Sequence, residues 1–384
     1  MQLPGVPLTR FALSGATIFD GEDFREGTAL VIENERIAAM VDERHLPPDI
    51  ERRPLGGGLL APGYIDIQVN GGGGHLLNGD PSETCVRGIA AAHRRFGTVG
   101  LLPTVITDAP DVMARSVEAV RAARRNGAAG VLGIHVEGPF IDPRRKGAHD
   151  ERFIRPLADE DISAIASADC GRLLLTVAPN IVPAEAIRGL AAAGIIVSLG
   201  HADASAEQAS EALRAGATVF THLFNAMSQL EPRAPGMAGA ALADPTCFCS
   251  LIVDGQHVHD AALKVALAAK GTDRLVLITD AMPSAAGGPD RFQLQGRPVA
   301  LRSGRLELEN GTLAGSNLTM DVAVRNCVHR LGVPLADALR MASFNAAAVL
   351  RLDDRLGRLA PGYLASLVHL SEELEVLATW IEGE

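Results

Sequence analysis

The sequence predicts an α/β protein whose main part is a (β/α)8 TIM barrel, with a second, smaller β-sandwich domain formed from both chain ends. Two observations support this prediction. Short apolar runs of strand type alternate with Ala-rich helical stretches, which is the pattern of repeated βα units around a parallel sheet. Nearly every apolar run also ends in a polar residue that is capable of chemistry, and the carboxyl ends of barrel strands form the catalytic mouth.

The composition agrees with closely packed helices and strands. The chain has 384 residues, of which 47% are hydrophobic and only 4% aromatic, with 40 glycines. Its core must therefore consist of Ala, Val, Leu and Ile, which suits an α/β protein. The net charge of −11 argues against a general nucleic-acid or membrane-surface binder, because both need basic surfaces.

The two chain ends are expected to form the smaller domain. Residues 11–61 contain short strand signals separated by turns, and strand signals return after about residue 356 in LGRLAPGYLASLVHL. We expect these strands to pair with each other. The predicted domains are residues 1–61 with 357–384, and the barrel over residues 62–356.

The barrel strands follow from the apolar runs, and helical stretches such as 85–97, 111–127 and 205–217 lie between them. Residues 292–314 are expected to form β-hairpins inserted after the last barrel strand. The eight expected strands are 64–68, 99–104, 131–137, 173–179, 195–201, 218–223, 248–254 and 275–280.

Targeting and membrane signals are not recognisable. The first residues, MQLPGVPLTRFALSG, lack a basic start followed by a long apolar run. No stretch approaches the ~20 uninterrupted apolar residues of a spanning helix. The five cysteines form no CxxC pattern, and Cys247 and Cys249 are expected to be small core residues rather than metal ligands. We expect a cytoplasmic protein.

Three strand-end residues predict a metal site. His201 and His222 end successive strands, and Glu137 ends an earlier one. A single strand-end histidine is more often a hydrogen-bonded structural residue, but two with a glutamate favour ligands. One glutamate and two histidines form the ligand set of a catalytic zinc site with an open position for water. The pKa of water bound there falls from 15.7 to about 7.

Asp280 ends the last expected strand. It could be the N-cap of a following turn. Its functional interpretation is the base that takes a proton from the attacking water and later delivers it to the leaving group.

Gln68 and Asn70 pose a separate question. They follow the first barrel strand in YIDIQVNG and share one face, because strand side chains repeat every two residues. Two neutral amides are weak metal ligands, so a direct role in holding an ion is not expected of them.

Several motifs, taken in chain order, resemble the N-acetylglucosamine-6-phosphate deacetylases of the amidohydrolase superfamily. The resemblance implies hydrolysis of N-acetylglucosamine 6-phosphate to glucosamine 6-phosphate and acetate. It covers nearly the whole chain. The motifs are PGYIDIQVNGGGG, GIHVEGPFI, KGAH, SLGHADAS, THLFNAM, RAPGMAGA, VDGQHV, LITDAMPSAAG and GTLAGSNLTM.

The resemblance implies roles for individual residues. Glu137, His201 and His222 match the metal ligands, Asp280 matches the acid/base, and His149 matches the residue that polarises the acetyl carbonyl. It further implies a homodimer, or a dimer of dimers, in which Arg233 reaches the neighbouring active site. The implied substrate contacts are Ala148, His149, Asn225, Ala226, Arg233, His257, Leu313, Ala314 and Gly315.

The same resemblance addresses the two amides. Many amidohydrolases carry His-x-His where this chain has Gln68 and Asn70, and those histidines hold a second metal. We therefore expect one divalent ion per subunit, with zinc first and Fe²⁺, Co²⁺ or Mn²⁺ as alternatives. Gln68 and Asn70 are expected to support the site by hydrogen bonds. Asn180 and Met282 depart from the familiar pattern, in which these positions hold a glutamate and a smaller polar residue.

Alternative functions belong to two classes. One is another deacylase of the superfamily, such as an N-acetylgalactosamine-6-phosphate deacetylase, which leaves the choice between the gluco and galacto substrates open. A dihydroorotase-like or D-aminoacylase-like enzyme would lack RAPG together with VDGQH. The other is a non-catalytic scaffold, which is expected to have lost ligands or the base. The expected partner is a phosphorylated amino sugar, with no nucleic acid and no membrane.

Overall fold

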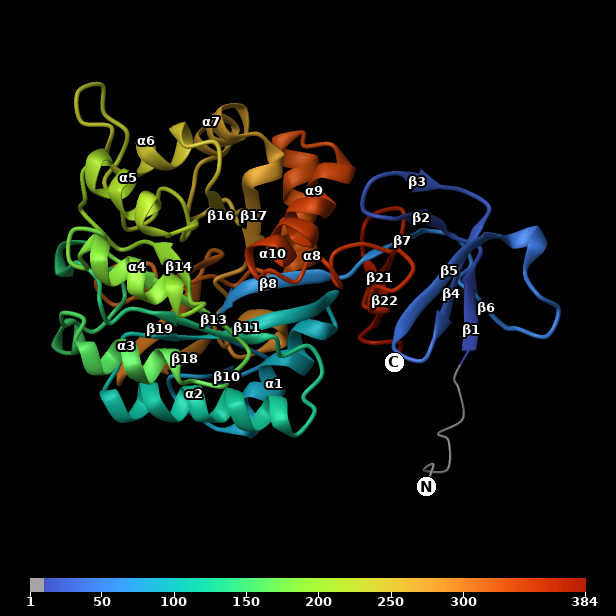
Figure 1. Ribbon diagram of the computed structural model, residues 1–384, viewed down its shortest axis with the longest axis horizontal. Coiled ribbons are helices and arrows are strands. Elements are labelled where there is room, and N and C mark those ends of the chain that lie inside the picture. The colour runs from blue at the N-terminus through green and yellow to red at the C-terminus, as the bar shows by residue number, and fades with distance from the viewer. Residues whose placement is uncertain (1–9) are drawn as a thin grey trace.

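A computed structural model of the chain describes residues 10–384, which form a barrel and a smaller pair of β-sheets joined through β8 (Figure 1). The barrel sheet holds eight strands in the order β17-β16-β15-β14-β13-β12-β11-β8, and the registers between neighbours are parallel. An isolated parallel bridge between Val69 and Ala281 joins the two edges. The backbone amide of Asp280 also donates to the carbonyl of Gln68 at 3.0 Å. The predicted (β/α)8 fold is confirmed.

The barrel strands agree with the expected apolar runs, with shifted ends. They are β8 (Tyr64–Val69), β11 (Thr98–Ile106), β12 (Gly133–Glu137), β13 (Arg172–Val177), β14 (Ile196–Leu199), β15 (Val219–Phe220), β16 (Phe248–Ile252) and β17 (Leu275–Ile278).

Helices cover the outside of the barrel, as Figure 1 shows for α1 to α7. Local sequence explains where some of them begin. Ser205 accepts from the amide of Gln208 at 3.3 Å, and the Gln208 side chain accepts from the amide of Ser205 at 2.9 Å, so two free donors at the start of α5 are satisfied. The helices are α1 (Glu83–Arg94), α2 (Pro110–Arg125), α3 (Asp159–Ala166), α4 (Ala184–Ala192), α5 (Ala206–Ala215), α6 (Gly236–Ala243), α7 (Asp260–Lys270), α8 (Met320–Asn326), α9 (Leu335–Ala342) and α10 (Phe344–Val349).

The predicted insertion after the last barrel strand is a three-stranded antiparallel sheet of β18 (Arg291–Leu294), β19 (Arg297–Arg302) and β20 (Arg305–Leu308). Its apolar face packs in a small cluster with residues from the barrel mouth. That cluster includes Leu294 and Val299 from the insertion with Ile106 and Met282 from the barrel. A short hairpin of β9 (Gly71–Gly72) and β10 (His75–Leu76) follows β8.

The smaller domain consists of two sheets, in agreement with the predicted β-sandwich from both chain ends. The second sheet pairs β21 from the C-terminal part with β7 from the N-terminal part in antiparallel register. Phe11, Ile32, Leu60 and Leu367 belong to one buried core cluster between the sheets. The domain limits at residues 61 and 357 stay a prediction. The first sheet holds β5 (Arg36–Asp42), β4 (Thr28–Glu33), β1 (Arg10–Ser14) and β6 (Glu51–Pro54), and the second holds β22 (Val376–Trp380), β21 (Leu367–Leu370), β7 (Leu59–Pro62), β2 (Thr17–Phe19) and β3 (Phe24–Arg25).

Two further expectations concern buried cysteines and membrane segments. All five cysteines are free and buried. Among the residues that the structure describes, no helix combines the length and the apolar character needed to cross a membrane.

Candidate active site

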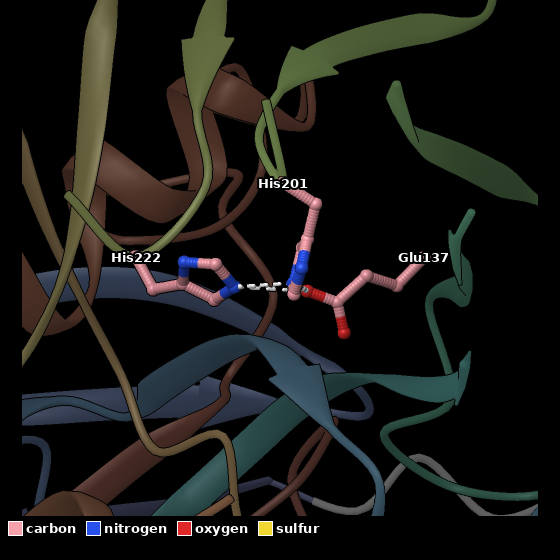
Figure 2. A group of neighbouring side chains, drawn as sticks. All are labelled: Glu137, His201 and His222. Carbon is pink, nitrogen blue, oxygen red and sulfur yellow. Dashed lines mark hydrogen bonds and ion pairs between the residues drawn. The ribbon is translucent and has the colours of Figure 1, made fainter. Parts of the chain in front are cut away.

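Three side chains from different strands converge at the carboxyl end of the barrel (Figure 2). Glu137 is the last residue of β12, His201 follows β14, and His222 follows β15. The Glu137 Oε1 atom lies 3.1 Å from His201 Nε2 and 3.0 Å from His222 Nε2, and the two nitrogens are 3.1 Å apart. Among residues 10–384, these three form the group of His, Cys, Asp and Glu whose ligand atoms could hold a metal ion.

The dimensions of this triangle fit one small divalent ion. Four-coordinate zinc has ligands at about 2.0–2.2 Å, which corresponds to separations of about 3.3–3.6 Å between neighbouring ligand atoms. The observed separations of 3.0–3.1 Å are close to that value. Hydrogen bonds alone do not account for the three short distances, because a single Nε2–H of one histidine cannot donate equally well to the Nε2 atom of the other histidine and to the Glu137 carboxylate. The donor set and its spacing are therefore suited to a divalent cation.

The backbone aims these ligands into the barrel mouth. His201 and His222 have positive φ angles of 47° and 34°, and Asp280 has a φ of 52°. Residues other than glycine seldom adopt this left-handed conformation, which costs of order 1–3 kcal/mol and is concentrated at functional sites. The left-handed turn comes just after the strand at all three positions.

Hydrogen bonds fix one ligand more firmly than the other. His201 Nδ1 lies 2.9 Å from the carbonyl oxygen of Arg145, so this nitrogen donates and Nε2 is left as the ligand atom. His222 Nδ1 is buried and has no hydrogen-bond partner among the described residues. The backbone of His222 is held by its amide, which donates to Ser250 Oγ at 2.8 Å.

The charge of the site depends on Glu137. Burial opposes its ionisation, but hydrogen bonds and charge from His201 and His222 hold its pKa well below the usual range. The carboxylate is therefore ionised, as a metal ligand must be.

Asp280 lies beside this group and is held by the two amides. Its Oδ1 atom accepts from Asn70 Nδ2 at 2.6 Å and from Gln68 Nε2 at 3.3 Å. Gln68 Nε2 also donates to Glu137 Oε1 at 3.1 Å. Withdrawal from water and the charge of Glu137 raise the pKa of Asp280 to about 6. The two amides thus contact the carboxylates, and Asn70 Oδ1 has no partner among the described residues.

His149 faces Glu137 from a loop after β12. Its Nε2 atom is 3.8 Å from Glu137 Oε2, and its Nδ1 atom is 2.8 Å from Thr107 Oγ1. Burial, followed by the neighbouring His201, lowers the pKa of His149 well below its usual value, so the ring is neutral.

The cavity above these residues has a volume of about 390 Å³, a size suited to a small substrate. Most of the predicted substrate contacts line it. The Asn225 side chain donates to the carbonyls of His222 and Leu223 at 3.2 and 3.3 Å, and His257 Nδ1 lies 2.6 Å from Asp254 Oδ2. The predicted contacts along its wall are Ala148, His149, Asn225, Ala226, His257, Leu313, Ala314 and Gly315.

Arg233 is not brought into this cavity by the single chain. It lies on an exposed stretch before α6, does not line the cavity, and has no hydrogen-bond or ion-pair partner among the described residues. Its predicted role in a neighbouring subunit stays a prediction.

Sequence reasoning missed three residues near the site. Arg144 and Arg145 line the cavity, and their position directly before KGAH was the available signal. Both are paired with Asp203, and Arg144 is also paired with Asp142. Thr107 was missed because the pattern ended the second strand at Thr104, whereas β11 continues to Ile106.

The departures from the familiar pattern have different consequences. Met282 lines the cavity. Asn180 does not line it and donates to Asp142 Oδ2 at 2.6 Å, which supports the loop that leads to His149.

His135 is fully buried below the site, where its Nε2 atom lies 2.8 Å from Thr176 Oγ1.

Comparison with known proteins gives consistent matches. The Amidohydrolase family model matches residues 59–384, and the NagA composite domain matches residues 10–60. An N-acetylgalactosamine-6-phosphate deacetylase of Shewanella sp. (strain ANA-3) is 41% identical over 86% of this chain and 84% of its own length. The human N-acetylglucosamine-6-phosphate deacetylase is 39% identical over 87% and 85%. The crystal structure of N-acetylglucosamine-6-phosphate deacetylase from Pasteurella multocida superposes with a TM-score of 0.95, at 33% identity over 98% and 99%.

Proposed function

This chain belongs to the amidohydrolase family, and we propose that it hydrolyses N-acetylglucosamine 6-phosphate to glucosamine 6-phosphate and acetate. The observation that carries the proposal is the convergence of Glu137, His201 and His222 beside Asp280 at the base of a cavity. Relatives that match most of this chain are N-acetylhexosamine-6-phosphate deacetylases.

Glu137, His201 and His222 would hold one divalent ion, and zinc is the ion that this donor set suits best. The ion would lower the pKa of water at the site and polarise the acetyl carbonyl. Gln68 and Asn70 contribute no charge, so they suit a site for one ion rather than two.

Asp280 carries the proton through the reaction. In its ionised form it accepts a proton from the attacking water, and it then delivers that proton to the sugar nitrogen as the C–N bond breaks. The amides of Gln68 and Asn70 hold its Oδ1 atom at 3.3 and 2.6 Å, so its other oxygen is available for the proton. His149 donates from Nε2 to the acetyl oxygen, where negative charge develops in the transition state.

The substrate phosphate needs hydrogen-bond donors, and a protein with a negative net charge must provide them from a few residues at the site. Asn225, the Ala226 backbone amide and His257 lie along the cavity wall. We propose that Arg233 of a second subunit completes this group in a homodimer. Two facts support a role outside its own chain: Arg233 is exposed, and it has no partner among the described residues. Arginine suits phosphate because its planar fork can bond two oxygens at once.

The alternative substrate is N-acetylgalactosamine 6-phosphate. The specific observation in its favour is the 41% identity to the Shewanella enzyme with that name. The two sugars differ only in the orientation of one hydroxyl group, so the same metal site and base would serve both.

Acetate release distinguishes these possibilities. The assay uses both phosphorylated sugars and their unphosphorylated forms, with metal analysis of the same sample. We expect the highest kcat/KM on N-acetylglucosamine 6-phosphate. No acetate from either phosphorylated sugar would contradict the proposed function, and a clear preference for the galacto sugar would select the alternative.

Arg233→Ala tests the phosphate site. It should cost about 1.5–3 kcal/mol of binding, the range for hydrogen bonds to charged groups, on phosphorylated substrate only. Glu231→Gln, in the same exposed stretch, is the matched control.

Mixed dimers test whether Arg233 acts across subunits. Arg233→Ala chains are mixed with Asp280→Asn chains. A heterodimer then has one complete pocket, which combines the base of the first chain with the arginine of the second. Recovered activity supports sharing between subunits. An equal loss of binding in Arg233→Ala for the phosphorylated and the unphosphorylated sugar contradicts the contact with phosphate. No recovery of activity in verified heterodimers contradicts sharing between subunits.

A further inference from the structure

Among the described residues, the Nδ1 atom of His149 has one hydrogen-bond partner, the hydroxyl group of Thr107. Thr107 Oγ1 lies 2.8 Å from His149 Nδ1 and 3.4 Å from the carbonyl oxygen of Glu137. Both Thr107 and His149 are buried. A hydroxyl has one proton, so it can be donated to the imidazole or to the carbonyl, but not to both.

The two choices give opposite tautomers of a neutral ring. If Thr107 donates to Nδ1, the proton of His149 is on Nε2. If Thr107 donates to the Glu137 carbonyl, then Nδ1 carries the proton and Nε2 is only an acceptor. The second arrangement turns the Nε2 lone pair toward the ionised Glu137, whose Oε2 atom is 3.8 Å away. The shorter contact and the charge of Glu137 both favour the first arrangement.

The β18–β19 turn holds both partners of this contact. Gln295 Nε2 donates to the carbonyl of Thr107 at 2.6 Å, and Arg297 Nη2 donates to the carbonyl of Ala148, next to His149, at 2.6 Å. Arg297 Nη2 also donates to Gln295 Oε1 at 2.8 Å. The turn therefore ties together the end of β11 and the loop that carries His149.

A glycine makes room for the hydroxyl. A Cβ atom on Gly138 would lie 2.2 Å from Thr107 Oγ1, and Gly138 has a φ of +81°. Any larger residue after the ligand Glu137 would displace the Thr107 hydroxyl or strain the backbone.

We propose that Thr107 is a positioning residue that sets the Nε2–H tautomer of His149, with the β18–β19 turn holding the pair in place. The inference rests on the proposed function, because it assigns His149 Nε2–H as the donor to the acetyl oxygen. Thr107 does not line the cavity, so it acts through His149 rather than on the substrate.

The first test compares Thr107→Val, which removes the hydroxyl at nearly the same volume, with Thr107→Ser, which keeps it. Substitution of the hydrogen-bond partners of metal-bound histidines typically costs 10- to 100-fold in metal affinity or activity, and the partner of His149 orients an imidazole in the same way. We expect Thr107→Val to lower kcat for acetate release by about 10- to 100-fold with little change in KM, and Thr107→Ser to recover most of that loss. Metal content and Tm are measured for each variant. Equal kcat for valine and serine variants of unchanged Tm, or a loss confined to KM, overturns the proposal.

The second test does not depend on activity. Nitrogen NMR of the zinc-loaded protein with ¹⁵N-labelled histidine reports which ring nitrogen carries the proton, and His149→Asn identifies the signal. We expect the proton on Nε2 of His149 in the wild type and a mixed or Nδ1–H population in Thr107→Val. A wild type in the Nδ1–H form overturns the inference. If NMR finds the proton on Nε2 of His149 but the protein has no deacetylase activity, the proposed function is overturned and the inference about the tautomer is not.

The third test addresses the turn. Arg297→Ala removes the contacts to Ala148 and Gln295 and should lower kcat by about tenfold. Arg302→Ala, an exposed change on the same strand, is the matched control and should have no effect. Equal kcat for the two variants overturns the role of the turn.

Discussion

Lowering the pH from 7 to 5 should reduce the hydrolytic activity, because Asp280 must be ionised to accept a proton. Burial and the nearby Glu137 raise its pKa to about 6. The sign follows directly: a carboxyl group acts as a base only above its pKa, so the rate falls as the pH falls.

The size of the effect follows from the same value. With a pKa of about 6, the ionised fraction is roughly 0.9 at pH 7 and roughly 0.1 at pH 5, a difference of about tenfold. A divalent ion beside Asp280 adds positive charge, which lowers the pKa and moves the decline to lower pH. Tenfold is therefore the largest decrease expected from Asp280 between these two pH values.

The assay is the pH profile of kcat for acetate release, with metal content measured at each pH so that loss of the ion is recognised. Asp280→Asn should lower kcat by about 10²–10⁴-fold, the usual contribution of a general acid or base, and should remove the decline between pH 7 and 5. Glu372→Gln, an exposed carboxylate far along the chain, is the control. Near-normal turnover in Asp280→Asn, or an unchanged acid limb in its residual activity, would refute the assignment of the base.

Two further predictions concern the ion and a buried carboxyl group. Elemental analysis should find one tightly held divalent ion per chain, and its removal should lower Tm because binding to the native state stabilises it; two ions that are both required would contradict the role of Gln68 and Asn70. Burial raises the pKa of Asp66 to about 7, so the stability that its protonated form contributes is fully present below about pH 4 and is lost as the pH rises through 7. Asp66→Asn should therefore raise the free energy of unfolding relative to wild type by more at pH 8 than at pH 5, by roughly 4 kcal/mol at most, and should raise Tm accordingly; an equal shift in Tm at both pH values would count against this.

The barrel and its strand-end residues could be predicted because they depend on local patterns. Nearly every apolar run ends in a polar residue, and the carboxyl ends of the strands in a barrel meet at one face. The exact ends of the strands were harder to predict from the sequence. The second barrel strand was predicted to end at Thr104, and Thr107 was therefore missed. Pro103, which cannot donate a backbone hydrogen bond to a sheet, lies within β11. In the structure a register shift between Leu101 and Pro103 accommodates the proline, and β11 continues to Ile106.

Contacts between distant segments could not be predicted from local patterns. The carbonyl of Arg145 accepts from His201, and every residue has a carbonyl, so no residue type signals this role. Arg297 and Ala148 are 149 positions apart, and only the docking of the inserted sheet brings them together. The Asn180 side chain, which follows a barrel strand like the ligands do, turns to Asp142 instead of the cavity. Position at a strand end thus predicts closeness to the mouth but not the direction of the side chain.

The two amides at the end of β8 suit a site with one ion because they are weak metal ligands and add no negative charge. Glu137 and an ionised Asp280 supply two negative charges, which one divalent ion balances. Gln68 Nε2 contacts both carboxylates, at 3.1 and 3.3 Å, and so fixes their separation without adding charge. Asp66 lies below them, but burial raises its pKa to about 7, so it is only about half ionised at pH 7 and supplies less than the full extra negative charge that a second dication needs. Replacing the amides by histidines would supply ligands without this charge, and we therefore expect the double variant Gln68→His, Asn70→His to bind a second ion only weakly.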